Sequence, residues 1–428
     1  MELSTPKGTR DFSPEEKIVR DKVVNTLKEV FELYGYAPLE TPILEKFDVL
    51  ASKYAGGVEI LKETFRLKDQ GGRDLGLRYD LTVPMCRYIA MNPTIKMPFK
   101  RYQIGEVFRD GPVASARYRQ FTQCDVDVIG SSSMATDAEI IALIYVAFCK
   151  LDFEVNIKIN NRKLLNDILD YSGIEKSRQE AVILSIDKLE KLGINVVKNE
   201  LKEQKIDDKK INKIIDIISI KGNNQQKINQ LNNFLKKSEG LSEIEQLLDY
   251  LKNLNFEADF DVSLARGLAY YTGTVIETFL KNSSVKSSVC AGGRYDNMIG
   301  SFLGKGNYPA VGVSFGVDRI YDAIFEKQKT RQKTATQIYV IPIKTLNESI
   351  RIAQQLRDAG INTDIDSMDK GPSRNLEYAN SLGIPYVLFI GKKELQENKV
   401  KLRDMKSGKE EMSDIQAIIK KFTSSSKQ

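Results

Sequence analysis

The sequence predicts an α+β protein, in which an antiparallel β-sheet core is flanked by helices and followed by a C-terminal α/β domain. Short alternating runs between Thr64 and Gly130 are separated by turn residues, which is typical of antiparallel strands. Residues 162–254 are rich in Lys, Asn, Ile, Leu and Glu at helical spacing, which indicates a helical insertion. Residues 337–428 alternate strand with helix, as a compact α/β domain does.

The composition excludes several kinds of chemistry. The 428 residues include 64 Lys and Arg, 58 Asp and Glu, four Cys, no Trp and no His. Without an imidazole, the chain cannot use Ser-His-Asp or Cys-His nucleophiles or His-ligated zinc. We therefore predict no metal-ligating residues. Any catalysis must use carboxylates, guanidinium groups, backbone dipoles, a bound metal or the substrate's own atoms.

The same composition predicts a soluble, cytoplasmic protein with no membrane partner. The four cysteines are scattered without C-x-x-C spacing, which is typical of a reducing compartment. The segment MELSTPKGTRDF contains no apolar signal region. The most apolar stretch, Ile140 to Cys149, is half of the roughly 20 residues that a membrane span needs. A net charge of +6 permits nucleic-acid binding without requiring it.

The first predicted element is a helix that begins at Ser13-Pro14-Glu15-Glu16. Serine is a favourable cap, proline suits the first helical position, and Glu16 completes a capping box. Apolar residues then recur at helical spacing until Gly35, which ends the helix. The extended segment that follows, Ala37 to Glu45, contains Pro38 and Pro42, and proline in a strand favours an edge or an interface.

Strands and one buried helix are predicted next. The runs TFRLKD, GGRDLGLRYD, KRYQIGEVFRD and RQFTQCDVDVIG alternate and are separated by turn residues, as in an antiparallel sheet. Thr136 to Leu151 is apolar throughout, which predicts a helix buried against the sheet, with Thr136 and Glu139 as a second capping box. Phe153 to Ile159 alternates as a strand.

These patterns divide the chain into a main domain of residues 1–161 and 255–328, an insertion of residues 162–254, a polar linker of residues 329–336, and a C-terminal domain of residues 337–428. The sheet pattern resumes after the insertion in DFDVSLARGLAYYTGTVIETFL, SVCAGGRYDNMIGSFLGKG and PAVGVSFGVDRIYDAIF. The charged run KEQKIDDKKINK in the insertion fits either a solvated helix face or a surface that grips RNA.

Four arginines occur beside turns, glycines or apolar runs: Arg78, Arg109, Arg266 and Arg319. A guanidinium group suits phosphate in such places, because its fork matches two oxygens and it keeps its charge. For any one of them a structural salt bridge is the alternative. The last three, in separate glycine-flanked settings, favour a polyanionic ligand.

Polar side chains also gather on one predicted sheet face. Asp125 and Asp127 share a face with Gln123 by the two-residue period, and Asp80 lies in another strand-like segment. The alternative is a solvated face; buried carboxylates would instead need a partner such as a cationic or donor-bearing substrate. The pair Tyr270-Tyr271 fits either a core or a planar ligand, and the GGRYD turn lets the backbone approach a ligand. The residues thus predict a protein that binds a phosphate compound and a polar small molecule.

The chain resembles the class II aminoacyl-tRNA synthetases, and within them the histidyl-tRNA synthetase family, nearly from end to end. YAPLETPILE resembles the family's motif 1, FRDGPVASARYRQF its motif 2 and AVGVSFGVDRI its motif 3. RGLAYYTGTVIE and AGGRYD resemble its histidine-recognition segments. LRYDLTVP with QFTQCDVDVIG is more similar to the eukaryotic and archaeal branch than to the bacterial one.

The resemblance implies ATP-dependent ligation of L-histidine to tRNA(His) through a histidyl-adenylate, with Mg²⁺ as cofactor. It implies that Arg109, Arg266 and Arg319 are catalytic and contact the ATP phosphates. It also implies that the substrate histidine is surrounded by Asp80, Thr82, Arg109, Gln123, Asp127, Arg266, Tyr270 and Tyr271. The main domain would be catalytic, the insertion would clamp the acceptor arm, and the C-terminal domain would bind the anticodon. Two copies would form a homodimer through the segment around Pro42.

Two departures and two alternatives accompany this resemblance. Motif 2 usually has an acid two residues after its arginine for the adenine amino group, whereas this chain has Gly111 there and Asp110 one place early. The bacterial branch often has histidine where this chain has Thr122. The alternatives are non-catalytic paralogues: the regulatory subunit of ATP phosphoribosyltransferase, or a module that binds uncharged tRNA.

Overall fold

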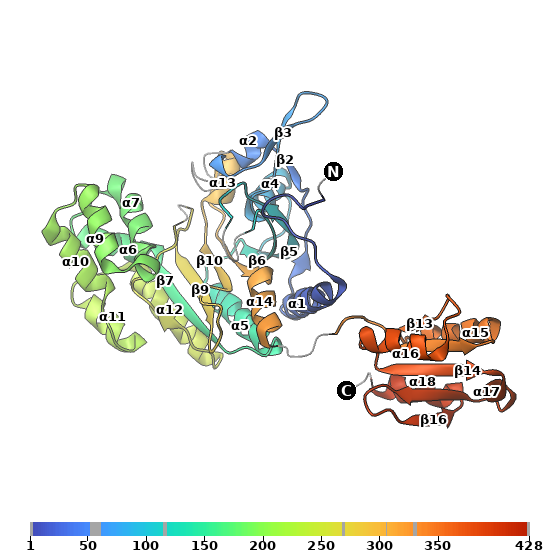
Figure 1. Ribbon diagram of the computed structural model, residues 1–428. Helices are drawn as coiled ribbons and strands as arrows, with labels where there is room; N and C mark the ends of the chain where they lie inside the picture. The colour runs from blue at the N-terminus through green and yellow to red at the C-terminus, as the bar shows by residue number, and fades with distance from the viewer. Residues whose placement is uncertain are drawn as a thin grey trace. The chain divides into compact units, whose positions relative to one another are not determined.

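The computed structural model describes residues 3–51, 61–113, 118–267, 270–304, 306–327 and 332–425. They form two compact units (Figure 1). The first unit contains residues 1–11 and 22–326, and the second contains residues 12–21 and 327–428.

An eight-stranded sheet is the centre of the first unit. Its strand order is β1-β5-β6-β11-β10-β9-β7-β8. In that order the strands are β1 (Ala37–Pro38), β5 (Phe99–Phe108), β6 (Gln120–Ile129), β11 (Ala310–Gly316), β10 (Cys290–Arg294), β9 (Thr274–Leu280), β7 (Val155–Asn161) and β8 (Asp259–Phe260). The six inner strands pair antiparallel, and only the two-residue strands at the edges pair parallel. The predicted antiparallel core is confirmed.

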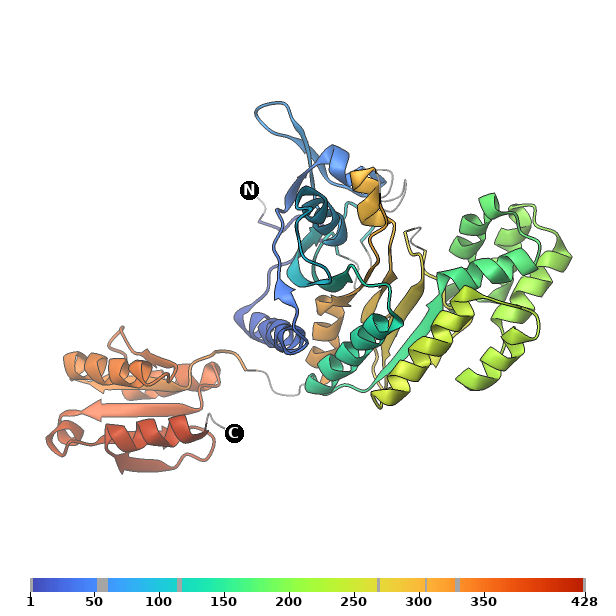
Figure 2. The ribbon, with the colours of Figure 1, turned by 180° about the vertical axis from the view of Figure 1, so that it is seen from behind.

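Three helices lie beside this sheet: α1 (Pro14–Leu33), α5 (Met134–Lys150) and α14 (Val317–Lys327) (Figure 2). They supply apolar side chains to its core. Leu27 and Phe31 of α1, Ile144 of α5 and Ile320 of α14 are all fully buried. The capping box at Ser13 is confirmed, because Ser13 and Glu16 each accept a hydrogen bond from the other's backbone N–H.

The predicted capping box of α5 is wrong. Helix α5 begins at Met134, and the hydroxyl of Ser133 accepts the bond from the N–H of Ala135. Thr136 already lies in the first turn, and its hydroxyl contacts that of Ser131 at 2.7 Å. Glu139 reaches away to Lys100, at 2.7 Å. A tertiary ion pair therefore takes the carboxylate that the local pattern assigned to the cap.

The predicted single run of strands from Thr64 to Gly130 is also corrected. It divides between the main sheet and a three-stranded sheet of order β2-β4-β3. That sheet contains β2 (Leu44–Lys46), β3 (Arg66–Lys68) and β4 (Asp74–Leu77), and near it lie α2 (Phe47–Leu50), α4 (Thr82–Met91) and α13 (Met298–Leu303). Helix α4 was not predicted, although its apolar residues recur at helical spacing. It packs on α13, and together they bury a second small core.

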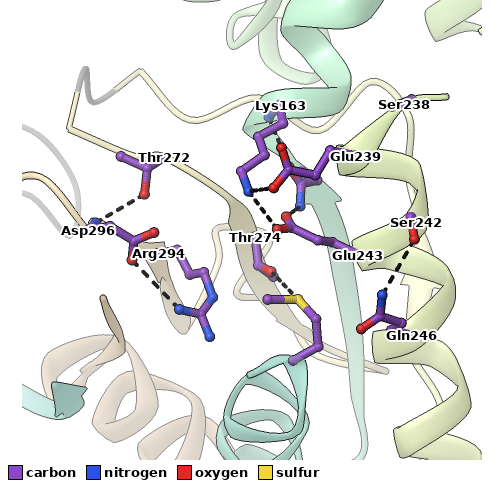
Figure 3. Close-up of polar contacts among 12 residues, drawn as sticks. Lys163, Ser238, Glu239, Ser242, Glu243, Gln246, Thr272, Thr274, Arg294 and Asp296 are labelled. Atoms are coloured by element: carbon purple, nitrogen blue, oxygen red, sulfur yellow. Dashed lines mark hydrogen bonds and ion pairs between the residues drawn. The ribbon is translucent and has the colours of Figure 1, made fainter. Parts of the chain in front are cut away.

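Residues 162–253 contain seven helices. These are α6 (Arg162–Tyr171), α7 (Lys176–Ile186), α8 (Leu189–Leu192), α9 (Ile194–Glu203), α10 (Asp208–Ile218), α11 (Asn224–Asn232) and α12 (Glu239–Asn253). Helix α12 packs against both α5 and α6. Lys163 Nζ lies 2.7 Å from Glu239 and 2.6 Å from Glu243, so an ion pair ties the first of these helices to the last (Figure 3).

The second unit contains a five-stranded sheet of order β13-β12-β14-β15-β16. Its elements are β12 (Ile338–Ile343), α15 (Leu346–Asp358), β13 (Thr363–Ile365), α16 (Pro372–Ser381), β14 (Tyr386–Gly391), α17 (Lys392–Gln396), β15 (Val400–Asp404), β16 (Glu410–Ser413) and α18 (Ile415–Ser425). The first three strands in space are parallel, as alternation of strand and helix requires, and the last two pair antiparallel. In the described part of the chain, no helix is both long and apolar enough to cross a membrane.

Candidate active site

A cavity of about 410 Å³ opens over the central strands of the main sheet. All eight residues predicted to surround the amino acid line it: Asp80, Thr82, Arg109, Gln123, Asp127, Arg266, Tyr270 and Tyr271. They come from segments that span almost two hundred residues of sequence, so the fold has gathered them. The polar sheet face of Gln123, Asp125 and Asp127 is therefore a cavity wall, and the alternative of a solvated face is wrong.

Cross-strand register explains why this wall is polar. Asp127 of β6 is paired with Arg101 of β5 and with Gly312 of β11. In the next row on the same face, Asp125 is paired with Gln103 and Ser314. Residues paired across a sheet point to the same side, so each row presents its side chains together.

A second cavity of about 790 Å³ is lined by Arg109, Arg266 and Arg319. Arg109 and Arg266 also line the first cavity, so the two adjoin at these side chains. Burial lowers the pKa of Arg319, and the positive charges of Arg266 and Arg109 lower it further. Three guanidinium groups that repel one another beside a hollow form a site for an anion.

Each of these arginines is held by contacts with neighbouring protein groups. The Arg109 guanidinium lies over the rings of Tyr79 and Phe121, 4.2 and 4.9 Å from their centroids. Arg319 Nη1 donates to the carbonyl oxygen of Ser288 at 2.6 Å.

Arg266 is paired with Glu277 of β9. Burial lowers its pKa, but the neighbouring Tyr271 and Glu277 outweigh this effect, so the net shift is upward. Arg266 is therefore a permanent cation held at the junction of the two cavities.

The acidic end of the first cavity contains three buried carboxylates. Asp80 precedes α4 and accepts a hydrogen bond from the N–H of Val83 at 2.9 Å. Burial raises the pKa of Asp80, and it raises that of Asp125 to about 7. Asp127 is held by Arg101 and by the hydroxyl of Tyr295. This end of the cavity suits a ligand that carries donors or positive charge.

Sequence reasoning missed Arg101 and Glu277 and did not assign Tyr295 a role. Arg101 alternates along KRYQIG on the same face as Gln103, and a basic residue on that face was a usable signal. Its position opposite Asp127 depends on the register between two strands, which the sequence alone does not state.

Other candidates have structural roles. Arg78 is buried and donates to the carbonyl oxygens of Thr41 at 2.7 Å and Glu106 at 2.8 Å, so it is no part of the anion site. The predicted GGRYD turn is corrected, because Gly292, Gly293 and Arg294 lie in β10. Arg294 pairs with Asp137 at 2.5 Å, and its contact with Asp296 is drawn in Figure 3. Parts of the expected motif 2 and of RGLAYY, residues 114–117 and 268–269, lie outside the described residues.

Gly111, which departs from motif 2, lies against another acid. A Cβ atom at Gly111 would be 2.7 Å from Oε1 of Glu63. The space next to motif 2 is therefore filled by a carboxylate from a different segment.

Solved structures with the same fold indicate the class of protein to which the chain belongs. The chain superposes on the crystal structure of histidyl-tRNA synthetase from Nostoc sp. with a TM-score of 0.87 and 32% identity, covering 98% of this chain and 99% of that one. A structure titled as an ATP phosphoribosyltransferase regulatory subunit/histidyl-tRNA synthetase from Bacillus halodurans gives a TM-score of 0.76 at 21% identity, a likeness of fold alone. The fold is that of a class II aminoacyl-tRNA synthetase.

The family follows from the sequence comparisons. A family model described as "Histidyl-tRNA synthetase" matches residues 8–320, and one described as "Anticodon binding domain" matches residues 337–425. "Histidine--tRNA ligase 1" of Bacillus cereus is 45% identical over 415 residues, covering 96% of this chain and 97% of that relative. The chain belongs to the histidyl-tRNA synthetase family. These relatives are bacterial, so they lend no support to the expected eukaryotic and archaeal likeness.

Proposed function

We propose that the protein ligates L-histidine to tRNA(His), using ATP and passing through a histidyl-adenylate. The observation that carries this proposal is the convergence of Arg109, Arg266 and Arg319 on one hollow that adjoins a carboxylate-rich cavity. Phosphate chemistry and recognition of a donor-bearing amino acid thus meet at one place. Family membership agrees with this reading.

In the first step, the histidine carboxylate attacks the α-phosphorus of ATP, a new P–O bond forms, and pyrophosphate leaves. Negative charge grows on the oxygens of that phosphorus. We assign its stabilisation to Arg109, Arg266 and Arg319, which are already held in place before the reaction. Positioning and charge suffice for such a transfer, so the absence of histidine from the chain is no obstacle.

The amino acid would lie in the first cavity. Asp80 and Thr82 would hold its α-amino end, while Asp127 and a tyrosine of the pair Tyr270-Tyr271 would contact the imidazole. Gln123 would complete the wall. In the second step the 3′ end of the tRNA attacks the activated carbonyl, a phosphate oxygen of the adenylate accepts the proton, and AMP leaves.

The resemblance implies Mg²⁺, but the described residues show no protein site for it. Among the residues that the structure describes, no three acidic or thiol side chains are grouped so that they could hold a metal ion. We therefore assign the ion no ligand and no step, and Mg²⁺ stays a prediction from the resemblance.

We assign the macromolecular contacts to separate parts of the chain. Residues 1–161 and 255–328 form the catalytic domain, residues 329–336 a linker, and residues 337–428 the anticodon-binding domain. The helices within residues 162–254 contact the acceptor arm. The eukaryotic and archaeal likeness and the cytoplasmic location stay predictions from the sequence.

The homodimer is proposed through the segment around Pro42. The side chains that follow it, Ile43 and Leu44, are 44% and 49% exposed in the single chain. Exposed apolar side chains in this segment are what a partner chain would cover, which supports this part of the proposal.

Histidine-dependent ATP–pyrophosphate exchange by the purified protein tests the proposal. Exchange that requires histidine is expected for the wild type, and its absence would favour a non-catalytic paralogue. Arg266→Ala should abolish exchange while the protein stays folded and dimeric. Arg266→Lys should also be severe, because a point charge does not reproduce the fork of the guanidinium. Unchanged exchange in either variant would remove Arg266 from the site.

A further inference from the structure

Arg101 is a fully buried cation beside the candidate active site. Its side chain is 0% exposed, and it does not line either of the two cavities described above. Its Nη2 lies 2.7 Å from Oδ2 of Asp127. Among the described residues, none of its three guanidinium nitrogens has a hydrogen-bond partner, so its contact with Asp127 is an ion pair. A buried charge with so few partners costs free energy, so stability alone does not explain it.

Asp127 links this cation to the cavity. It lines the cavity, yet both of its oxygens already contact protein groups, since Oδ1 accepts from the Tyr295 hydroxyl. A Cβ at Gly312 would be 1.9 Å from Oδ1, so only glycine leaves room for the carboxylate in this position. Three neighbours on different elements thus fix one carboxylate at the cavity wall.

We propose that Arg101 is a positioning residue for the amino-acid substrate: it keeps Asp127 an ionised, oriented carboxylate that accepts an N–H of the imidazole ring. The inference rests on the proposed function, in which Asp127 contacts the imidazole. Arg101 would contact neither histidine nor ATP, and it would affect specificity for the amino acid through Asp127. Amino acids whose side chains carry no hydrogen-bond donor could not satisfy a carboxylate held in this way.

Electrostatics agrees with this geometry. Burial raises the pKa of Asp127, and the charge of Arg101 opposes that rise. The titratable groups that interact electrostatically with Asp127 are Arg101, Asp125, Tyr295, Cys86 and Tyr36. Of these, only Arg101 is a cation. Its loss would leave Asp127 with neutral or anionic neighbours, and the carboxyl would take up a proton.

The test is Arg101→Met in the exchange assay, with histidine and ATP varied separately. The KM for histidine should rise by about tenfold or more, as for loss of a charged hydrogen-bond partner, while the KM for ATP stays within about twofold. Arg101→Lys should recover part of the loss. The ratio of variant to wild-type kcat/KM for histidine should increase with pH, because Asp127 then loses its proton. This ratio cancels the titration of free histidine.

Arg87→Met is the matched control. Arg87 pairs with Glu45 at 2.6 Å, and Glu45 is 5% exposed, so this variant also leaves a buried carboxylate unpaired, but away from the cavity. It should lower stability without changing the ratio of the two KM values. The same change in both KM values for Arg101→Met, or no change in either, would overturn the inference.

If Arg101→Met does not fold, the double variant Arg101→Met with Asp127→Asn removes both buried charges. It should fold, because no charge is left unpaired, and its histidine KM should be raised without the added pH dependence. A histidine KM equal to that of the wild type would overturn the inference. If the wild type shows no histidine-dependent exchange, the proposed function itself fails, which is a distinct result.

Discussion

Asp125 shows how the environment of one residue sets its chemistry. It lies two residues from Asp127 on the same strand, and both face the cavity. Asp127 has a cation at 2.7 Å and accepts from the Tyr295 hydroxyl. For Asp125, burial raises the pKa to about 7, although the charge of Arg101 opposes the rise. This elevated pKa sets Asp125 apart from an ordinary exposed aspartate.

This difference predicts a pH-dependent stability. Because the folded-state pKa of Asp125 lies above its ordinary value of 3.8, the folded state holds its proton at pH values where the unfolded state has lost it. The contribution of Asp125 to the free energy of unfolding is fully present below pH 3.8 and is lost as the pH rises through about 7. Asp125→Asn should therefore stabilise the protein at pH 8 relative to wild type, by at most about 4 kcal/mol at roughly 1.4 kcal/mol per pKa unit.

Urea unfolding at pH 5 and pH 8 measures this effect. The increase in the free energy of unfolding caused by Asp125→Asn should be smaller at pH 5 than at pH 8. An equal gain at both pH values would show that Asp125 titrates normally.

At the scale of elements, the close approach of two helices holds the first and last helices of the insertion together. A Cβ atom on Gly240 of α12 would lie 2.2 Å from the backbone nitrogen of Leu164 in α6. The first turns of the two helices therefore meet backbone to backbone, next to the ion pairs of Lys163 with Glu239 and Glu243 (Figure 3).

Asn224 of α11 caps the β8 edge of the main sheet. Its side-chain amide donates a hydrogen bond to the carbonyl oxygen of Ala258 and accepts one from the N–H of Phe260, as a neighbouring strand would.

Gly240→Ala should destabilise the protein by about 1–3 kcal/mol, as overpacking does. Backbone, unlike a flexible side chain, cannot move aside. Thermal or urea unfolding measures the loss. Gly371→Ala is the control, because a Cβ there meets nothing within 4 Å, and it should be neutral or slightly stabilising. Equal behaviour of the two variants would contradict the close crossing of α6 and α12.

At the scale of the whole molecule, the proposed dimer accounts for apolar surface that the single chain leaves uncovered. Exposed apolar side chains occur beside Pro42, in Ile43 and Leu44, and at Met91 at the end of α4. A stable protein–protein contact needs a contiguous apolar centre, and these residues are candidates for it.

Ile43→Glu should therefore weaken the dimer, since a carboxylate would be buried without a partner at the contact. Sedimentation at several protein concentrations measures the shift toward monomer. Leu346→Glu replaces a residue of the second unit with similar exposure, 47%, and should leave the oligomeric state unchanged. A dimer of unaltered strength in Ile43→Glu would place the contact elsewhere.

Local patterns in the sequence predicted much of this structure. The period of two placed Gln123, Asp125 and Asp127 on one face, and helical spacing located the insertion, because both signals depend on neighbours along the chain. The type of residue was informative as well, since guanidinium groups beside glycines pointed to an anion. Where a local pattern competed with a distant partner, as for Glu139 with Lys100, the prediction was wrong.

Only the tertiary structure decided which of these residues meet. The sequence by itself determined the kinds of element, the polar face and the charge of its candidates. The pairing of Arg101 with Asp127 and the convergence of Arg109, Arg266 and Arg319 depend on strand order and register. Register is set by contacts between segments far apart in the chain, and a shift of one residue would turn every side chain to the opposite face.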